Sequence, residues 1–175
     1  MGKIYWFSGL SGVGKSSIAQ ATKKLLLKEN FKVLILDGDD IRNKINIKLS
    51  FTPPDILENN RLIINICKKH SSQYDVILVP IISPYEKSRK LAKKLLGKNF
   101  YLIYIQASIE ILKKRDTKGL YLQQERGEID NLIGFSKINK YEKPHNFNLL
   151  INTQSESLTS SSEKLYSFIL KHTIT

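Results

Sequence analysis

A glycine-rich octapeptide near the start of the chain constrains the fold more than any other feature. The run GLSGVGKS, Gly9–Ser16, fits the pattern G-x-x-x-x-G-K-[ST]. It follows an apolar run, Ile4–Ser8, that predicts a buried strand, and it precedes a helical pattern over Ser16–Glu29. Its glycines let the backbone curl so that successive N–H groups point inward, at the positively polarised start of a helix. In this context the pattern predicts a loop that binds the phosphates of a nucleoside triphosphate.

Within such a loop the Lys15 ammonium reaches the β- and γ-phosphates, and the Ser16 hydroxyl ligates Mg²⁺. The remaining phosphate oxygens are held by backbone groups. The candidate nucleotide-binding residues of this segment are Gly9, Ser11, Gly12, Gly14, Lys15, Ser16 and Ser17.

Strand-like and helical patterns alternate along the rest of the chain. The other expected strands are Val33–Leu36, Val76–Ile81, Phe100–Ile105 and Leu149–Ile151. The other expected helices are Glu58–His70, Pro84–Leu96, a helix that Ser108 caps and that runs through Arg115, and Ser162–His172. This alternation predicts an α/β fold of the P-loop NTPase type, with three layers and a central parallel five-stranded sheet.

We expect residues 1–175 to form a single domain, because the length suits one. Two stretches, Ile47–Leu57 and Asp116–Pro144, lack clean periodicity, and Ser155–Ser162 predicts an exposed turn. Long loops in compact domains often cover binding sites, so we expect a lid over about residues 116–144.

Composition limits the class of protein. There are 28 Lys and Arg against 16 Asp and Glu, a formal net charge of +12, but the lysines are spread over expected helix surfaces. No apolar run approaches the ~18 residues of a membrane span. The single cysteine, Cys67, excludes an internal disulfide framework and a Cys-rich zinc site. We expect a cytoplasmic enzyme with a small-molecule partner, bound neither to nucleic acid nor to a membrane.

The base-reading motif of GTPases, Asn-Lys-x-Asp, is missing, and the nearest approach is Asn139-Lys140-Tyr141-Glu142. A larger ATPase would need more chain. A small kinase that acts on a small phosphorylated acceptor fits the sequence best.

Further motifs follow in order. Leu36–Arg42 reads LDGDDIR, which is close to the family pattern L-D-G-D-N-[VI]-R. Phe51–Arg61 reads FTPPDILENNR, which is close to the pattern F-S-x-x-D-R-x-E-N-I-R of the same family. Ile82–Tyr85 reads ISPY, and Arg115–Tyr121 reads RDTKGLY, beside R-D-x-K-G-L-Y. Gly127–Ile129 and Tyr141–Pro144 match the lid blocks. With the octapeptide, these motifs resemble the adenylyl-sulfate (APS) kinase family over about residues 3–153.

The resemblance implies transfer of the γ-phosphoryl group of ATP, with Mg²⁺, to the ribose 3′-hydroxyl of APS. Asp39 would orient or deprotonate that hydroxyl, and Asp37 would hold Mg²⁺ through water or fix Lys15. Arg42 and Asn59 would hold the anionic bridge or ribose of the acceptor. Lys118 would reach phosphates, and Arg115 would stack on the ATP base.

In some members of the family, the serine at the position of Ser83 carries a phosphoserine intermediate. Direct in-line transfer of the phosphoryl group needs no such intermediate. We expect Ile82 and Ser83 to shape the acceptor pocket. The catalytic candidates are therefore Lys15, Asp39 and Ser83, and the metal candidates are Ser16 and Asp37. The substrate candidates are Asp37, Asp39, Arg42, Phe51, Asn59, Ile82, Ser83, Lys118, Gly119, Leu120 and Leu132. Dimers are common among relatives, which leaves a homodimer open.

The departures from the family patterns concentrate on the acceptor side. Ile56 stands where the family has an Arg that contacts the acceptor, and Leu132 replaces one of two Phe residues that sandwich the adenine. The stretch Gly134–Tyr141 is also two residues longer than its family counterpart. These changes favour a relative that phosphorylates CDP-phosphoramidate for capsule modification, with APS kinase as the alternative. A catalytically degenerate nucleotide-binding regulator and a basic nucleic-acid-binding module are the hypotheses from other classes.

Overall fold

The computed structural model describes residues 1–44 and 49–173. It contains a sheet of five parallel strands in the order β2-β3-β1-β4-β5. The strands are β1 (Lys3–Ser8), β2 (Val33–Ile35), β3 (Val76–Val79), β4 (Phe100–Gln106) and β5 (Leu149–Asn152). The predicted α/β fold with a central parallel five-stranded sheet is thereby confirmed.

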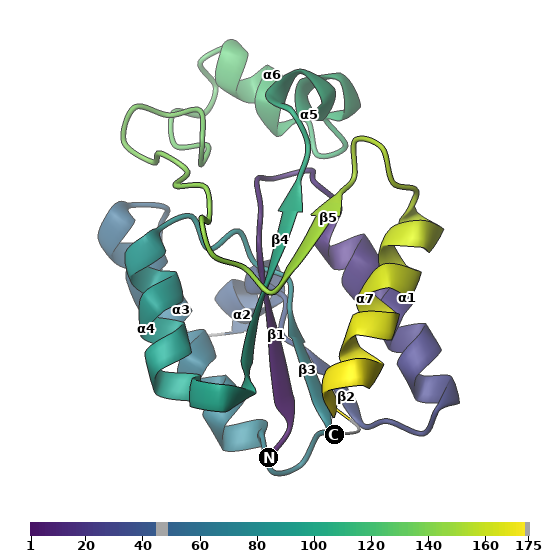
Figure 1. Cartoon of the computed structure of the whole chain (residues 1–175). Helices are drawn as coiled ribbons and strands as arrows, with labels where there is room; N and C mark the ends of the chain where they lie inside the picture. Colours follow the sequence, from purple (N-terminus) through teal and green to yellow (C-terminus); the bar gives the residue numbers. More distant parts are fainter. Residues whose placement is uncertain (45–48, 174–175) are drawn as a thin grey trace.

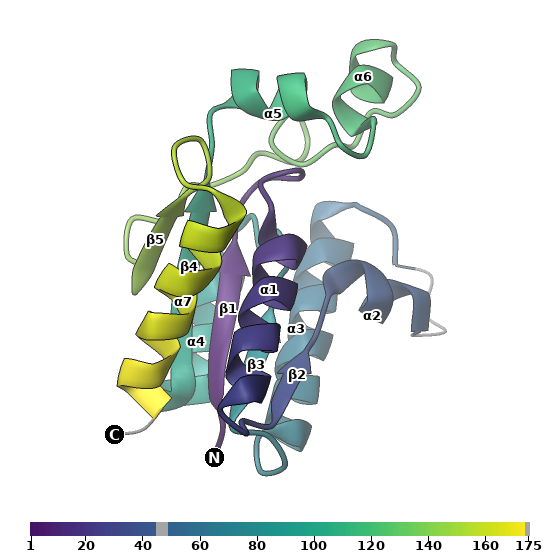
Figure 2. The same cartoon turned by 90° about the vertical axis from the view of Figure 1, so that its right-hand side faces the viewer.

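Helices cover both faces of this sheet (Figures 1 and 2). The helices are α1 (Lys15–Lys28), α2 (Gly38–Lys44), α3 (Pro53–His70), α4 (Glu86–Leu96), α5 (Ile109–Arg115), α6 (Leu120–Glu125) and α7 (Leu158–Thr173), with a 3₁₀ turn at Gly97–Asn99. Helices α1 and α7 lie against one face, and α3 and α4 lie against the other. Helices α5 and α6 and the loop after them lie beyond the carboxyl ends of the strands. Among the described residues, no helix is both long and apolar enough to cross a membrane.

Alternation along the central strand joins the two halves of the core. Tyr5 and Phe7 of β1 belong to the apolar cluster that includes α1 and α7, whereas Ile4 and Trp6 belong to the cluster that includes α3 and α4. All four side chains are almost completely buried. Burial of a side chain of this kind contributes about 1.5–3 kcal/mol, so β1 is held firmly from both sides. The glycine-rich loop that follows β1 therefore starts from a rigid support.

Strand order determines where a ligand can bind. Strand β1 lies between β3 and β4, and the chain passes from β1 through α1 to β2 on one side of the sheet before it returns to β4 on the other. In such sheets the loops diverge at the carboxyl ends of the strands and leave a crevice between them. The glycine-rich loop lies at this crevice.

Three expectations about local structure are wrong. Helix α3 begins at Pro53, not at Glu58, because Thr52 caps it by accepting the Asp55 N–H and because prolines fit the first helical turn, where an N–H has no partner. Helix α2 forms directly after Asp37, where no helix is expected. The last residues of the expected loop before α3 are thus helical, while its first two, 47 and 48, lie outside the described residues.

Helix α7 begins at Leu158, so most of the expected exposed turn at Ser155–Ser162 is helical. Ser161 and Ser162 are buried, and the Ser162 carbonyl accepts a hydrogen bond from the Thr22 hydroxyl of α1. Tertiary packing on α1 therefore decides the conformation of a serine-rich segment whose composition alone indicates a turn.

Candidate active site

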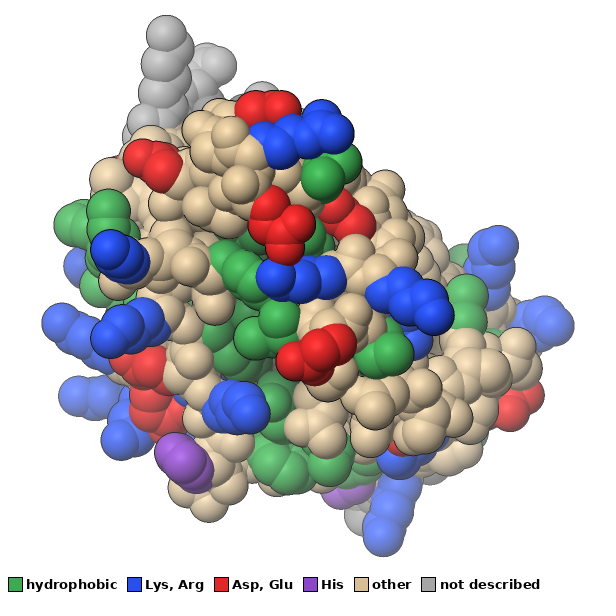
Figure 3. Space-filling view, turned by 90° about the horizontal axis from the view of Figure 1, so that it is seen from above, with side chains coloured by type: hydrophobic (Ala, Val, Ile, Leu, Met, Phe, Trp, Pro, Cys, Tyr) green, Lys and Arg blue, Asp and Glu red, His purple; other side chains and the backbone are tan. Residues whose placement is uncertain are grey.

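A cavity of about 630 Å³ opens at the carboxyl end of the sheet, between the glycine-rich loop, the starts of α2 and α3, the segment 80–84 and the lid. Figure 3 looks down on this end of the molecule and shows hydrophobic side chains in its centre among scattered acidic and basic ones. The cavity brings together most residues that the sequence indicates, namely Ser11, Gly12, Gly14, Lys15, Ser16, Ser17, Asp37, Asp39, Arg42, Phe51, Asn59, Ile82, Ser83, Lys118, Leu120 and Leu132. Gly9, Arg115 and Gly119 are not among its lining residues.

The glycines of the loop are required for different structural reasons. Gly12 and Gly14 have φ angles of 74° and 95°, which glycine adopts without the steric penalty of a side chain. Gly9 lies against the sheet, where an added Cβ would come within 2.3 Å of the Ile105 carbonyl oxygen of β4. Gly14 directly precedes α1, so the loop opens onto the positive end of that helix. This geometry suits a phosphate chain.

Lys15 is folded back onto its own loop. Its ammonium donates to the carbonyl oxygens of Gly9 at 3.0 Å and Leu10 at 2.7 Å, and only 8% of the residue is exposed. Burial, together with the charge of Lys118, lowers the pKa of Lys15 to about 7, although Asp37 and Asp39 act in the opposite direction. Near neutral pH, Lys15 is therefore close to losing its proton, and a phosphate placed beside it would favour the charged form.

Ser16 and Asp37 form the pair predicted for the metal. The Ser16 hydroxyl donates to Asp37 Oδ2 at 2.6 Å, and Asp37 Oδ1 accepts the backbone N–H of Asp39 at 3.0 Å. A hydroxyl and a carboxylate are hard oxygen donors of the kind that Mg²⁺ prefers, with phosphate oxygens and water completing its shell. In the described part of the chain, no group of three or more His, Cys, Asp or Glu residues offers another metal site.

Asp39 lies in the first turn of α2 and makes an ion pair with Lys118 of the lid, at 2.8 Å. Both side chains are more than half exposed, so the pair contributes little to stability. Its importance is geometric, since it joins the lid lysine to the candidate general base, and both residues line the cavity.

The motif at Arg115–Tyr121 forms part of the lid. The Asp116 carboxylate accepts the N–H groups of Tyr121 and Leu122 at the start of α6, and Gly119 precedes that helix with φ 67°. The buried Tyr121 hydroxyl donates to the Ser11 carbonyl at 2.8 Å, which fastens the lid to the glycine-rich loop. Burial, with Asp116 nearby, raises the pKa of Tyr121 to about 12, so this hydroxyl stays a donor.

The guanidinium of Arg115 lies against Thr153, with Nη2 at 2.6 Å from the Thr153 carbonyl oxygen. The Thr153 hydroxyl in turn donates to the Val13 carbonyl of the glycine-rich loop, at 3.1 Å. Arg115 thus lies beside this loop through Thr153, and its stacking on an ATP base stays a prediction.

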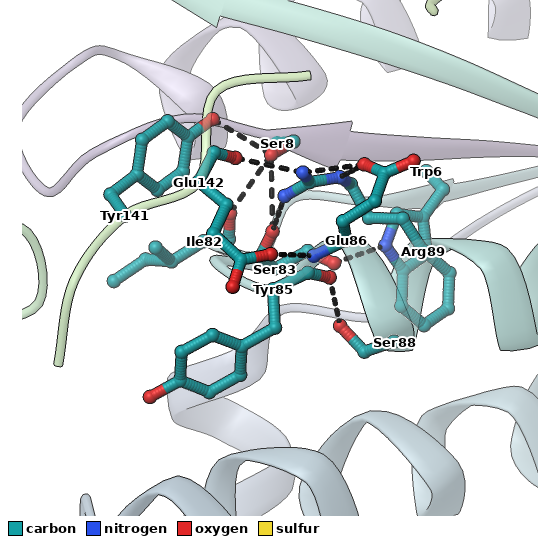
Figure 4. A network of polar contacts seen from close by, with 10 residues as sticks. All are labelled: Trp6, Ser8, Ile82, Ser83, Tyr85, Glu86, Ser88, Arg89, Tyr141 and Glu142. Carbon is teal, nitrogen blue, oxygen red and sulfur yellow. Dashed lines mark hydrogen bonds and ion pairs between the residues drawn. The ribbon is translucent and has the colours of Figure 1, made fainter. Parts of the chain in front are cut away.

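Ser83 is fixed in a turn that many contacts hold (Figure 4). Its φ of 42° lies in the left-handed region, which is strained for a residue with a side chain. Its hydroxyl accepts the Trp6 indole N–H at 3.0 Å, and its carbonyl accepts from Arg89 Nη1 at 2.7 Å and from the Ser8 hydroxyl at 3.2 Å. The buried Arg89 also donates to the Glu142 carbonyl, at 2.7 Å. Ser83 therefore lies in the cavity wall as part of a rigid unit.

The wall of the cavity that carries the predicted acceptor residues combines apolar and amide side chains. Ile56 and Leu132, the two departures from the family patterns, both line it and are largely buried. The Oδ1 atoms of Asn59 and Asn60 are buried without a partner among the described residues, which costs free energy unless a ligand donates to them. Arg42 stacks its guanidinium on the Phe51 ring, at 4.5 Å from the centroid, and donates to the Ser50 carbonyl.

Sequence reasoning missed several residues that organise this site. Trp6, Arg89, Tyr141 and Asn139 are buried or half-buried, and their polar groups bond to segments far away in the chain. The Glu86-x-x-Arg89 spacing of an ion pair directly after the ISPY motif is a signal that could have indicated Arg89. Tyr141 begins the lid block Tyr141–Pro144, whereas nothing local distinguishes Trp6 and Asn139.

The chain matches known proteins over nearly all its length. The family model described as adenylylsulphate kinase matches residues 1–152. The chain belongs to the adenylyl-sulfate kinase family. The adenylyl-sulfate kinase of Clostridium acetobutylicum is 35% identical over 173 residues, which cover 99% of this chain and 86% of that protein. That of Buchnera aphidicola is 38% identical over 172 residues, with 98% and 82% covered.

A solved structure of the same family has a similar fold. The Mycobacterium tuberculosis APS kinase in complex with AMPPNP and APS has a TM-score of 0.88 at 32% identity, covering 97% of this chain and 98% of that one. A gluconokinase from Sinorhizobium meliloti, at 14% identity and a TM-score of 0.68, shares the fold alone. As a member of the APS kinase family, the protein is an ATP-dependent kinase whose cofactors are ATP and Mg²⁺.

The lowered pKa of Lys15 predicts that ATP binding takes up a proton. Above pH 7 the free enzyme holds Lys15 largely neutral, while bound phosphates restore its charge, so uptake approaches one proton at pH 8 and is only about a tenth of a proton at pH 6. Calorimetry of Mg-ATP binding in buffers of different ionisation enthalpy measures this number. The control is Lys15→Arg, whose guanidinium stays charged and should take up none. Equal values for the two proteins at pH 8 would contradict the assignment.

The position of Asp39 predicts that Asp39→Asn lowers kcat by about 10²–10⁴-fold, because general-base contributions have this size, while ATP affinity changes little. Steady-state kinetics and ATP titration separate the two effects. Asp40→Asn is the matched control, since Asp40 is the exposed neighbour and does not line the cavity. A loss confined to ATP affinity would move Asp39 to the metal site.

Proposed function

We propose that the protein phosphorylates the ribose 3′-hydroxyl of APS. The observation that carries the proposal is a single cavity in which the phosphate-binding loop and the Phe51–Asn59 wall both face Asp39. Relatives at 35% and 38% identity carry the name adenylyl-sulfate kinase, and the similar solved structure holds AMPPNP together with APS. These comparisons favour APS over the CDP-phosphoramidate that the departures in the sequence suggest.

The groups around Asp39 suit a direct in-line transfer. The Asp39 carboxylate accepts the proton of the 3′-hydroxyl as that oxygen bonds to the γ-phosphorus, and the bond between this phosphorus and the bridging oxygen of ADP breaks. Lys15 exchanges its contacts with the Gly9 and Leu10 carbonyls for phosphate oxygens, and Lys118 leaves Asp39 for the transferred group. Mg²⁺, when bound beside Ser16 and Asp37, neutralises phosphate charge. The lid excludes water that would otherwise hydrolyse ATP.

A second candidate acceptor, CDP-phosphoramidate, rests on Ile56 and Leu132. Ile56 supplies an apolar surface where a cation would meet an anionic acceptor, and Leu132 supplies less stacking surface than an aromatic ring. A pyrimidine needs less stacking area than adenine, and base–aromatic stacking contributes about 1–3 kcal/mol.

Three further expectations stay predictions. They are a cytoplasmic location, a single kinase domain with its lid at about residues 116–144, and a homodimer.

Turnover of ATP/Mg²⁺ with APS and with CDP-phosphoramidate, side by side, tests the proposal. We expect 3′-phosphorylated APS as the product, and no product from Lys15→Ala with either acceptor, because the charge on the transferring phosphoryl group is then unopposed. Phosphorylation of the cytidine compound alone would transfer the assignment to the second candidate. Absence of product from both acceptors would favour the degenerate nucleotide-binding regulator.

The two departures predict a measurable shift in acceptor preference. In the double variant Ile56→Arg/Leu132→Phe, the new arginine can add a charge-assisted hydrogen bond to APS, worth about 1.5–3 kcal/mol. The kcat/KM for APS should therefore rise by about tenfold or more relative to that for CDP-phosphoramidate. Thermal unfolding checks that the buried arginine is tolerated, and Leu132→Phe alone gives the stacking part. An unchanged preference in a folded double variant would show that these positions do not select the acceptor.

A further inference from the structure

We propose that Asn139 is a positioning residue that determines acceptor affinity by joining the lid to the Phe51 wall. This inference rests on the proposed function, because it concerns the binding of an acceptor nucleotide in the same cavity. Asn139 belongs to none of the family motifs, and its side chain does not line the cavity. It acts through the residues that do.

The amide of Asn139 connects three segments that are distant in the sequence. Its Nδ2 donates to the Phe51 carbonyl at 2.7 Å and to the Asn131 carbonyl at 3.1 Å. Its Oδ1 accepts the Tyr85 hydroxyl at 2.9 Å. Only 1% of the residue is exposed, so water does not compete for these bonds. The lid, the start of α3 and the turn after β3 therefore meet at one side chain.

The backbone of Asn139 closes the lid loop on itself. Its N–H donates to the Ser136 hydroxyl at 2.8 Å, and its carbonyl accepts the Gly134 N–H at 2.6 Å. The Leu132 carbonyl accepts the N–H groups of Phe135 and Ser136, while the Leu132 N–H donates to the side chain of Gln124 in α6. The loop over residues 131–139 is thus a compact unit that holds Leu132 in the cavity wall.

The two walls of the proposed base site, at Phe51 and at Leu132, both depend on the loop over residues 131–139. Phe51 is 41% exposed, and both the Asn139 bond to its carbonyl and the stacked Arg42 anchor it. Leu132 faces the cavity from the lid. The separation between the two walls is therefore determined by Asn139, which bonds to Phe51 directly and to Leu132 through its loop.

The stretch Gly134–Tyr141 carries this arrangement. Its chain turns inward at the buried Asn139 and continues to Tyr141, whose hydroxyl pairs with Ser8 at 2.8 Å. Through Asn139, this stretch is a second proposed origin of acceptor selectivity, besides Ile56 and Leu132. Among the described residues, the hydrogen bonds of Asn139 join it to Phe51, Tyr85, Asn131, Gly134 and Ser136 and to no residue of the phosphate-binding loop, so ATP binding should be largely independent of it.

Three variants test the proposal in the full-length protein. Asn139→Ala removes every side-chain bond, and Asn139→Asp keeps an acceptor for Tyr85 but places a carboxylate against the Phe51 and Asn131 carbonyls. Tyr85→Phe removes a single bond and should have a smaller effect. The matched control is Ile138→Ala, because Ile138 is the adjacent residue, 65% exposed and away from the cavity.

We expect Asn139→Ala and Asn139→Asp to raise KM for the acceptor about tenfold, with kcat lowered less and KM for ATP within about twofold. A tenfold change corresponds to 1.36 kcal/mol, in the range of one or two buried hydrogen bonds. Equal increases in both KM values, or an acceptor KM that stays at the wild-type value, would overturn the proposal. The assay uses whichever of APS and CDP-phosphoramidate the wild type turns over.

Hydrogen–deuterium exchange of the ligand-free protein separates this inference from the proposed function. In Asn139→Ala, amides over residues 49–52 and 131–136 should exchange faster, while those of β1 and α1 keep wild-type rates. This readout needs no substrate, so it succeeds or fails whatever the acceptor is. Uniform loss of protection would indicate general unfolding, and unchanged protection would show that Asn139 holds neither wall.

Discussion

The close approach of Gly9 to two neighbouring strand ends fixes the position of everything else in the site. Its N–H donates to the Ile82 carbonyl after β3, and its Cα faces the Ile105 carbonyl of β4. A side chain at this position would push the loop off the sheet, and Lys15, Ser16 and the Ser83 turn would move with it. The ATP half of the enzyme therefore depends on backbone packing, which the buried strand β1 supports from below.

The acceptor half is organised in another way. Its walls come from the start of α3, the turn after β3 and the lid, and side-chain amides and guanidinium groups hold them together. Arg89 connects the Ser83 turn with Glu142 at the base of the lid, and Asn139 connects Phe51 with the lid loop. Each such connection depends on one side chain. A single substitution at Arg89 or Asn139 therefore removes a whole connection.

The two halves of the site differ in how they are held, by backbone packing in one and by single side chains in the other. This difference explains what the sequence predicts and what it does not. The five strands, the glycine-rich loop and the residues of the ordered motifs are encoded by contiguous segments, so local patterns and the family resemblance locate them. The start of α3 is missed because Pro53 and Pro54 read as helix breakers, although both fit a first turn that Thr52 caps. Asn139, Trp6 and Arg89 are missed because the bonds that tie them to the site, with Phe51, Ser83 and Glu142 respectively, span 53–88 residues of the chain. Their importance arises only when the fold brings these segments together.

The lid occupies the connection between the last two strands of the sheet. It leaves β4 at Gln106 and returns at Leu149, so both of its ends attach to the β4–β5 edge. All five strands of the sheet lie outside it, and its contacts with the other segments include the Tyr121 and Asn139 side chains and the Glu142 backbone N–H, which donates to the Pro84 carbonyl. This segment can thus change in length or sequence without interrupting a strand, within the limit that its Tyr121 bond to the glycine-rich loop sets. In a fold of this kind, one wall of the acceptor site lies in a loop connection that can vary separately from the walls at α3 and after β3.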